Sequence, residues 1–76
     1  MDDKLMQILK NINGTINYES ENGIAVRGLF DSLDIVNLVF EIEKDFGIII
    51  PFEELVPENF DNLNSIKIMI KRCIKK

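Results

Sequence analysis

The chain has 76 residues, of which 46% are hydrophobic, and a net charge of −4 at neutral pH. This length suits one small domain with a single core, and the apolar content excludes a disordered segment. The lack of histidine and the single cysteine exclude an internal disulfide, a conventional zinc site and a histidine-activated nucleophile. We therefore expect one domain over residues 1–76 and no metal site.

Hydropathy and charge distribution bear on location and partners. Apolar runs such as Ile48–Ile50 are far too short to span a membrane, and no charged-then-apolar signal segment opens the chain. We therefore expect a cytoplasmic protein without membrane insertion. Residues 1–66 carry all thirteen acidic side chains, which favours basic protein surfaces over nucleic acid as partners. Residues 67–76 carry five of the nine basic side chains, which suit a helix C-terminus; a membrane or nucleic-acid patch is the alternative interpretation.

The first predicted helix covers residues 2–13. Its apolar residues recur at helical spacing, and Asn13-Gly14 ends it. Residues 14–31 then form a long loop, because turn-forming pairs such as Asn22-Gly23 interrupt this segment. Six apolar side chains are expected to hold the loop against the core: Ile16, Tyr18, Ile24, Val26, Leu29 and Phe30.

A second predicted helix covers residues 32–46 and stops at Gly47. Ile48–Ile50 follow as a short extended crossing. Pro51 suits the first position of a short helix that Pro57 closes.

The last predicted helix begins after Asn62, its N-cap, and runs to about Lys75. The sequence thus predicts an all-α fold, a small antiparallel bundle of three main helices plus one short helix.

The helix predicted over residues 32–46 carries two apolar stripes. At about 100° per residue, one sector holds core-type residues: Ile35, Leu38, Val39, Ile42 and Phe46. A different sector holds Leu33, Val36 and Phe40. A helix on the outside of a small bundle needs one stripe, so we expect the second to be exposed; the alternative is that the loop 14–31 covers it. The second stripe has the composition of a transient protein interface, because its polar neighbours are mostly acidic: Asp34, Asn37, Glu41 and Glu43.

Ser32 lies where the long loop meets this helix. Asp31 suits the N-cap, and Asp34 then falls at the third helical position, which predicts a capping box. The Ser32 hydroxyl would lie in the first turn, where unpaired N–H groups and the helix dipole favour an attached or approaching phosphate. With no histidine as a base, this serine suits the attachment of a phosphorylated group better than attack on a substrate.

Residues 28–70 resemble acyl carrier proteins, through Asp31-Ser32-Leu33, the segment Glu43–Gly47 and Ile50-Pro51. The resemblance implies that Ser32, beside Asp31, carries phosphopantetheine donated from coenzyme A by a phosphopantetheinyl transferase with its own Mg²⁺. The thiol of that arm then holds an acyl or aminoacyl group as a thioester. The resemblance also implies a monomeric, non-catalytic carrier whose partner enzymes dock on one side of the helix: Leu33, Asp34, Val36, Asn37, Phe40 and Glu41.

The resemblance to carriers of fatty-acid synthesis is incomplete. Asn37, Lys44 and Ile49 stand where those carriers commonly have acids. Gly28–Ser32 is similar to the same region of D-alanyl carrier proteins, and Pro57–Leu63 resembles stand-alone carriers that work with AMP-forming ligases. The resemblance therefore implies loading by an AMP-forming ligase, with an acyltransferase or synthase downstream. A fatty-acid carrier, an unmodified carrier-like adaptor and a small enzyme using Ser32 are the alternatives.

Other chemically active side chains have simpler interpretations. Cys73 lies on the apolar stripe of the last helix, so we expect a core residue rather than a nucleophile. The carboxylate pairs Glu41 with Asp45, and Glu53 with Glu54, have the spacing of solvated faces rather than of an acid/base pair or metal site.

Overall fold

The computed structural model describes residues 2–74, in which helix is the only regular secondary structure. The elements are α1 (Asp2–Ile12), α2 (Ser32–Phe46), two 3₁₀ turns η1 (Phe52–Glu54) and η2 (Pro57–Phe60), and α3 (Leu63–Ile74). The predicted all-α fold with three main helices is confirmed. The expected end of the last helix at Lys75 lies outside the described residues.

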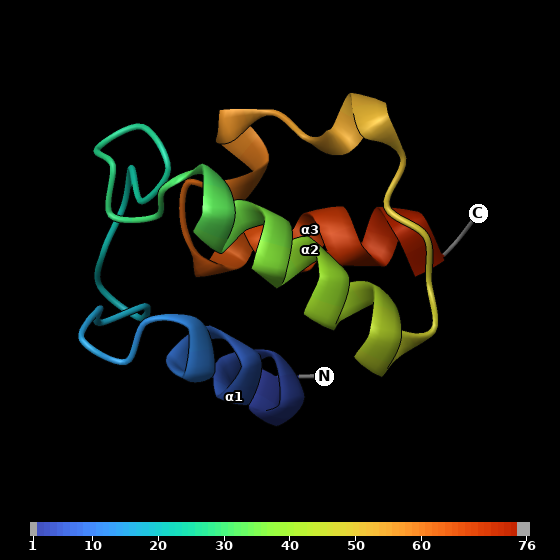
Figure 1. Cartoon of the computed structure of the whole chain (residues 1–76), viewed down its shortest axis with the longest axis horizontal. Coiled ribbons are helices and arrows are strands. Elements are labelled where there is room, and N and C mark those ends of the chain that lie inside the picture. Colours follow the sequence, from blue (N-terminus) through green and yellow to red (C-terminus); the bar gives the residue numbers. More distant parts are fainter. Residues whose placement is uncertain (1, 75–76) are drawn as a thin grey trace.

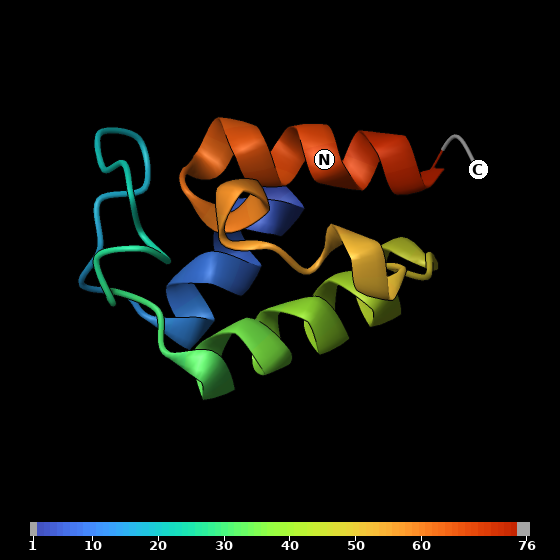
Figure 2. The same cartoon turned by 90° about the horizontal axis from the view of Figure 1, so that it is seen from above.

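The first helix runs antiparallel to the other two (Figures 1 and 2). Because the connection over residues 47–62 carries the chain back across the molecule, α2 and α3 run in the same general direction. Lys4 Nζ donates a hydrogen bond to the Asp45 carbonyl at 2.9 Å, which joins the start of α1 to the end of α2. Lys67 on α3 pairs with Asp2 on α1 at 3.3 Å.

The core lies where the three helices meet, and the predicted core stripes point into it. Leu38 and Ile42 of α2 are fully buried, and the other residues of that stripe are partly buried against them. The remaining buried residues come from every part of the described chain: Leu5, Ile8, Leu9, Tyr18, Ile24, Phe30, Ile50, Phe60, Ile66, Met69, Ile70 and Cys73. The core position expected for Cys73 is thus confirmed.

The long loop is held to the core largely as predicted, with one exception. Tyr18, Ile24 and Phe30 are buried, whereas Val26 is 73% exposed, so its expected anchoring role is wrong. The chain turns back at this point: the Arg27 N–H donates to the Gly23 carbonyl, and the Leu29 and Phe30 N–H groups both donate to the Ile24 carbonyl. This turn directs Ile24 inward and leaves Val26 on its outer side.

Tyr18 anchors the loop by a buried polar contact. Its hydroxyl lies 2.9 Å from the Leu9 carbonyl and 2.6 Å from the Asn13 carbonyl, so it caps the end of α1. Burial, and secondly the negative charge of Asp34, raise the pKa of Tyr18 to about 12. The phenol therefore stays protonated wherever the protein is folded near neutral pH.

Tyr18→Phe should lower the free energy of unfolding at pH 7 by about 1–2 kcal/mol, because the hydroxyl that donates to the end of α1 is lost. The difference between wild type and variant should shrink as the pH rises from 10 to 12. In that range the tyrosine of the unfolded chain ionises before that of the folded chain. Ionisation therefore lowers the free energy of unfolding of the wild type, whereas the variant has no phenol to ionise. Thermal melts of both proteins at pH 7, 10 and 11.5 measure this. A difference that grows with pH would contradict the assignment.

The segment between α2 and α3 differs from the single short helix expected between the two prolines. Pro51 precedes a single 3₁₀ turn, and Pro57 opens a second one instead of closing the first. A residue before proline is driven out of the helical region, and Val56 is extended at φ −121°, ψ 149°. Five residues between the prolines are therefore too few for an α-helix.

The predicted end of α2 and the predicted start of α3 are confirmed, whereas α1 ends at Ile12, one residue before the predicted Asn13. Gly47 ends α2 in the left-handed conformation, at φ 64°, and donates its N–H to the Glu43 carbonyl. Asn62 caps α3, because its Oδ1 accepts a hydrogen bond from the Ser65 N–H at 2.8 Å.

Candidate functional site

Ser32 is the first residue of α2 and is exposed. The predicted capping box is present: Asp31 Oδ1 accepts from the Asp34 N–H at 2.8 Å, and Asp34 Oδ2 accepts from the Asp31 N–H at 3.2 Å. These reciprocal bonds determine where the helix begins. The Ser32 hydroxyl is therefore presented from a rigid helix end rather than from a loose loop.

An apolar pocket of about 290 Å³ opens beside Ser32. One side consists of residues at and before the start of α2: Ala25, Phe30, Asp31, Ser32 and Ile35. The facing side consists of the segment Leu55–Pro57 together with Phe60. A group attached to Ser32 thus has an apolar cavity within its immediate reach.

The second apolar stripe of α2 is uncovered. Leu33, Val36 and Phe40 are 66%, 62% and 61% exposed, so the alternative in which the long loop covers this stripe does not hold. Since large apolar side chains exposed together mark interaction sites, this stripe is a candidate docking surface that begins next to Ser32.

The polar border of the stripe faces the groove between α1 and α2. Asp34, Asn37 and Glu41 line that groove, which has a volume of about 310 Å³. Glu43 does not line this groove, and its Oε2 accepts a hydrogen bond from the Ile50 N–H at 2.8 Å. Its carboxylate fastens the extended crossing after α2 instead.

Lys44 changes the charge at the far end of the stripe. Its Nζ lies 3.2 Å from Glu41 Oε2 and 5.8 Å from the centroid of the Phe40 ring. The exposed stripe therefore begins beside the carboxylates of Asp31 and Asp34. It ends beside Glu41, whose charge is offset by Lys44. A partner surface would meet more negative charge at the start of α2 than at its end.

Sequence comparison supports a carrier. No family profile matches the chain. A segment of 39 residues is 38% identical to aminoacyl carrier protein 1 of Bradyrhizobium diazoefficiens. This segment of the chain is therefore similar to a carrier protein. The segment is 51% of this chain and 43% of that relative, so less than half of the relative's length is matched.

The pocket wall was not predicted from the sequence. Leu55 and Val56 are 40% and 36% exposed, and nothing in their local pattern pairs them with Ser32. The available signal was an apolar pair just before a proline, which is common in surface connections. Recognising it as a wall requires the path of the chain from α2 to α3.

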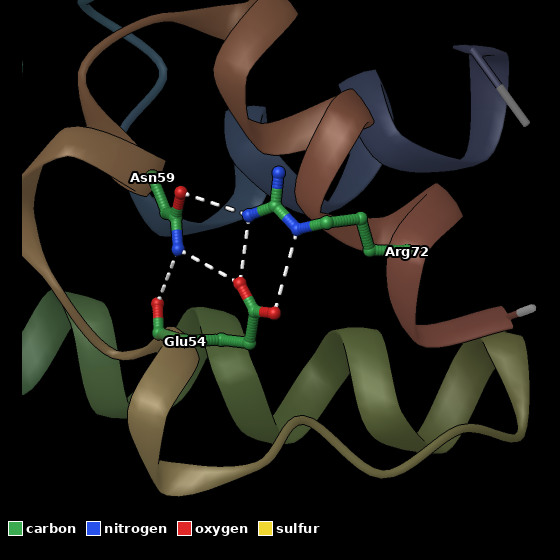
Figure 3. Close-up of polar contacts among 3 residues, drawn as sticks. All are labelled: Glu54, Asn59 and Arg72. Carbon is green, nitrogen blue, oxygen red and sulfur yellow. Dashed lines mark hydrogen bonds and ion pairs between the residues drawn. The ribbon is translucent and has the colours of Figure 1, made fainter. Parts of the chain in front are cut away.

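The other candidates stay outside the site. Glu54 of the acidic pair Glu53 and Glu54 forms an ion pair with Arg72 at 2.7 Å (Figure 3). Within residues 2–74, no three acidic or cysteine side chains converge as metal ligands. None of the helices in that range has the length and apolar character needed to cross a membrane.

Proposed function

We propose that the protein carries an acyl or aminoacyl group as a thioester on a phosphopantetheine arm attached to Ser32. The observation that supports this best is the position of Ser32, an exposed hydroxyl at the start of α2 between an apolar pocket and an exposed apolar stripe. The protein itself catalyses nothing in this proposal, and its work is delivery.

Attachment is a group transfer from coenzyme A to the Ser32 hydroxyl. The Ser32 Oγ forms a new bond to the phosphorus that bears the pantetheine, the bond to the nucleotide part of coenzyme A breaks, and that part leaves with the bonding electrons. Since this chain has no histidine, the phosphopantetheinyl transferase supplies the base that takes the hydroxyl proton. The attached arm supplies a thiol on which cargo is held.

Delivery depends on weak docking through the exposed stripe of Leu33, Val36 and Phe40. A flexible tether raises the concentration of cargo at whichever enzyme is docked. Asp34 and the other carboxylates near Ser32 steer basic partner surfaces, which permits fast association without tight binding. The partners are the transferase, a loading enzyme and an acyltransferase or synthase that removes the cargo.

We propose an AMP-forming ligase as the loading enzyme. Asn37 carries no charge, and Lys44 neutralises Glu41, so a strongly basic synthase surface gains little at the far end of the stripe. The similar protein is named an aminoacyl carrier protein, which favours an amino acid as cargo. A carrier of fatty-acid synthesis is the second candidate.

Mass spectrometry tests the proposal directly. Wild-type protein incubated with coenzyme A and a broad-specificity transferase should gain the mass of one phosphopantetheine. The modified protein should then accept an amino acid from a ligase of the same genome in the presence of ATP, and malonyl transferase should load it poorly. Efficient malonyl loading with no ligase activity would support the fatty-acid candidate. No mass gain, with partner binding intact, would support the unmodified adaptor.

A further inference from the structure

The chain contains two Asn-Gly pairs, Asn13-Gly14 directly after α1 and Asn22-Gly23 in the long loop. This dipeptide is chemically labile, because glycine has no side chain that keeps its backbone nitrogen away from the preceding side-chain amide. When the two groups are held together, the nitrogen attacks the amide carbon of its own neighbour, and a slow reaction becomes an intramolecular one. The surroundings of each pair therefore decide how fast it reacts.

Thr15 folds the Asn13 side chain back along the chain. Asn13 Oδ1 accepts a hydrogen bond from the Thr15 N–H at 3.0 Å and another from the Thr15 hydroxyl at 2.6 Å. Because both donors lie two residues further on, the side-chain amide lies beside the intervening Gly14 peptide. The two donors also point at the oxygen that becomes negative when the Gly14 nitrogen attacks, which is how protein donors stabilise an oxyanion.

The attacking nitrogen of Gly14 is available and activated. Within residues 2–74, no group accepts a hydrogen bond from the Gly14 N–H. Gly14 and Thr15 are exposed, so hydroxide and water reach the pair. The Asn13 carbonyl accepts a hydrogen bond from the Tyr18 hydroxyl at 2.6 Å. A donor on this carbonyl polarises the Asn13–Gly14 peptide and makes its N–H easier to deprotonate.

Asn22-Gly23 offers the same dipeptide in different surroundings. Asn22 Oδ1 accepts a hydrogen bond at 3.1 Å from Asn62 Nδ2, which belongs to the N-cap of α3. The Asn22 carbonyl accepts a hydrogen bond from Arg27 Nη1 at 2.9 Å, so the peptide that attacks is polarised in both pairs. The direction of the side chain distinguishes them. The Asn22 amide is tied to another element, whereas the Asn13 amide lies along its own backbone.

We propose that Asn13 is a site of spontaneous deamidation in the folded protein, and that Thr15 is the positioning residue that accelerates it. Hydroxide takes the Gly14 N–H proton, the nitrogen forms a bond to Asn13 Cγ, and the bond from Cγ to Nδ2 breaks. Nδ2 takes protons from water and leaves as ammonia, which closes a cyclic imide. Water then adds to one of the two imide carbonyls and breaks its bond to the Gly14 nitrogen. Addition at Cγ gives aspartate, and addition at the main-chain carbonyl gives isoaspartate.

Peptide mass spectrometry of the incubated wild-type protein compares the two pairs in one sample, because each product replaces an amide by a carboxylic acid. In the folded protein, Asn13 should convert about tenfold faster than Asn22, since only the Asn13 amide is held beside its attacking nitrogen. In guanidinium chloride neither side chain is held, and the two rates should become similar. Equal rates in the folded protein, or faster conversion of Asn22, would refute the proposed site.

Thr15→Val tests the positioning role, because it removes the hydroxyl with little change of shape. Conversion of Asn13 should become about threefold to tenfold slower, while Asn22 keeps its wild-type rate. Thr15 is exposed, so the fold should persist, and a thermal melt verifies this. Thr15→Ser keeps the hydroxyl and is the matched control, with an expected wild-type rate. A wild-type rate in folded Thr15→Val, or an equal loss in Thr15→Ser, would show that the hydroxyl does not act as proposed.

Discussion

Ser32→Ala should abolish the mass gain from coenzyme A and a transferase completely while leaving the fold intact. The Ser32 hydroxyl is exposed at the first position of α2, and Asp31 and Asp34 make the bonds that cap the helix. Removing the hydroxyl should therefore change the free energy of unfolding by no more than about 0.5 kcal/mol. Intact-mass spectrometry and a thermal melt of the same sample measure both effects.

Two other serines provide the controls. Ser20 lies in the loop and its hydroxyl is 3.4 Å from the Asn17 carbonyl, and Ser65 lies partly buried in the first turn of α3. Ser20→Ala and Ser65→Ala should both be modified as fully as the wild type. Equal mass gain in Ser32→Ala and wild type would show that another residue carries the arm, and the proposed site would be wrong.

Phe40→Ala should weaken docking much more than folding, whereas Leu38→Ala should do the reverse. Phe40 is 61% exposed, so its truncation should cost no more than about 1 kcal/mol, including its contact with Lys44. Leu38 is fully buried on the same helix, so its truncation should cost about 2–5 kcal/mol. For a domain of this size, about 4–8 °C of melting temperature corresponds to 1 kcal/mol, so the two variants are easily separated.

The docking effect is measured with the transferase as a defined partner. Exposed aromatic side chains at the centre of an interface are common hot spots, so kcat/KM for modification of Phe40→Ala should fall about tenfold. Lys10→Ala, an exposed change on α1, is the control and should keep the wild-type value. A wild-type kcat/KM for Phe40→Ala would exclude Phe40 from the transferase interface, and a melting temperature as low as that of Leu38→Ala would contradict its surface position.

Several sequence-based predictions failed where the chain leaves regular helix. Val26 is exposed because the turn closed by Arg27 and Gly23 directs Ile24 inward instead. The bond between the Glu43 carboxylate and the Ile50 N–H, which the chain brings back to it after Gly47, was not predicted. Both outcomes depend on how a loop folds back, and hydrophobic periodicity carries no information about that.

The sequence by itself determined α2 and the presentation of Ser32. Asp31, Asp34 and Gly47 limit the helix through bonds to atoms at most four residues away, and the two apolar stripes follow from helical geometry alone. Both partners of each of these interactions are close in the sequence, so the interactions can be predicted from the sequence alone.

Only the tertiary structure decided the pocket and its wall. Leu55 and Val56 line one pocket with Ser32, and Arg72 bonds to Glu54 eighteen positions away, because the connection 47–62 crosses the molecule on a path set by the packing of α1, α2 and α3. Its two 3₁₀ turns are too short to show a periodic pattern. The sequence therefore specified how Ser32 is presented, and the packing of the helices specified what surrounds it.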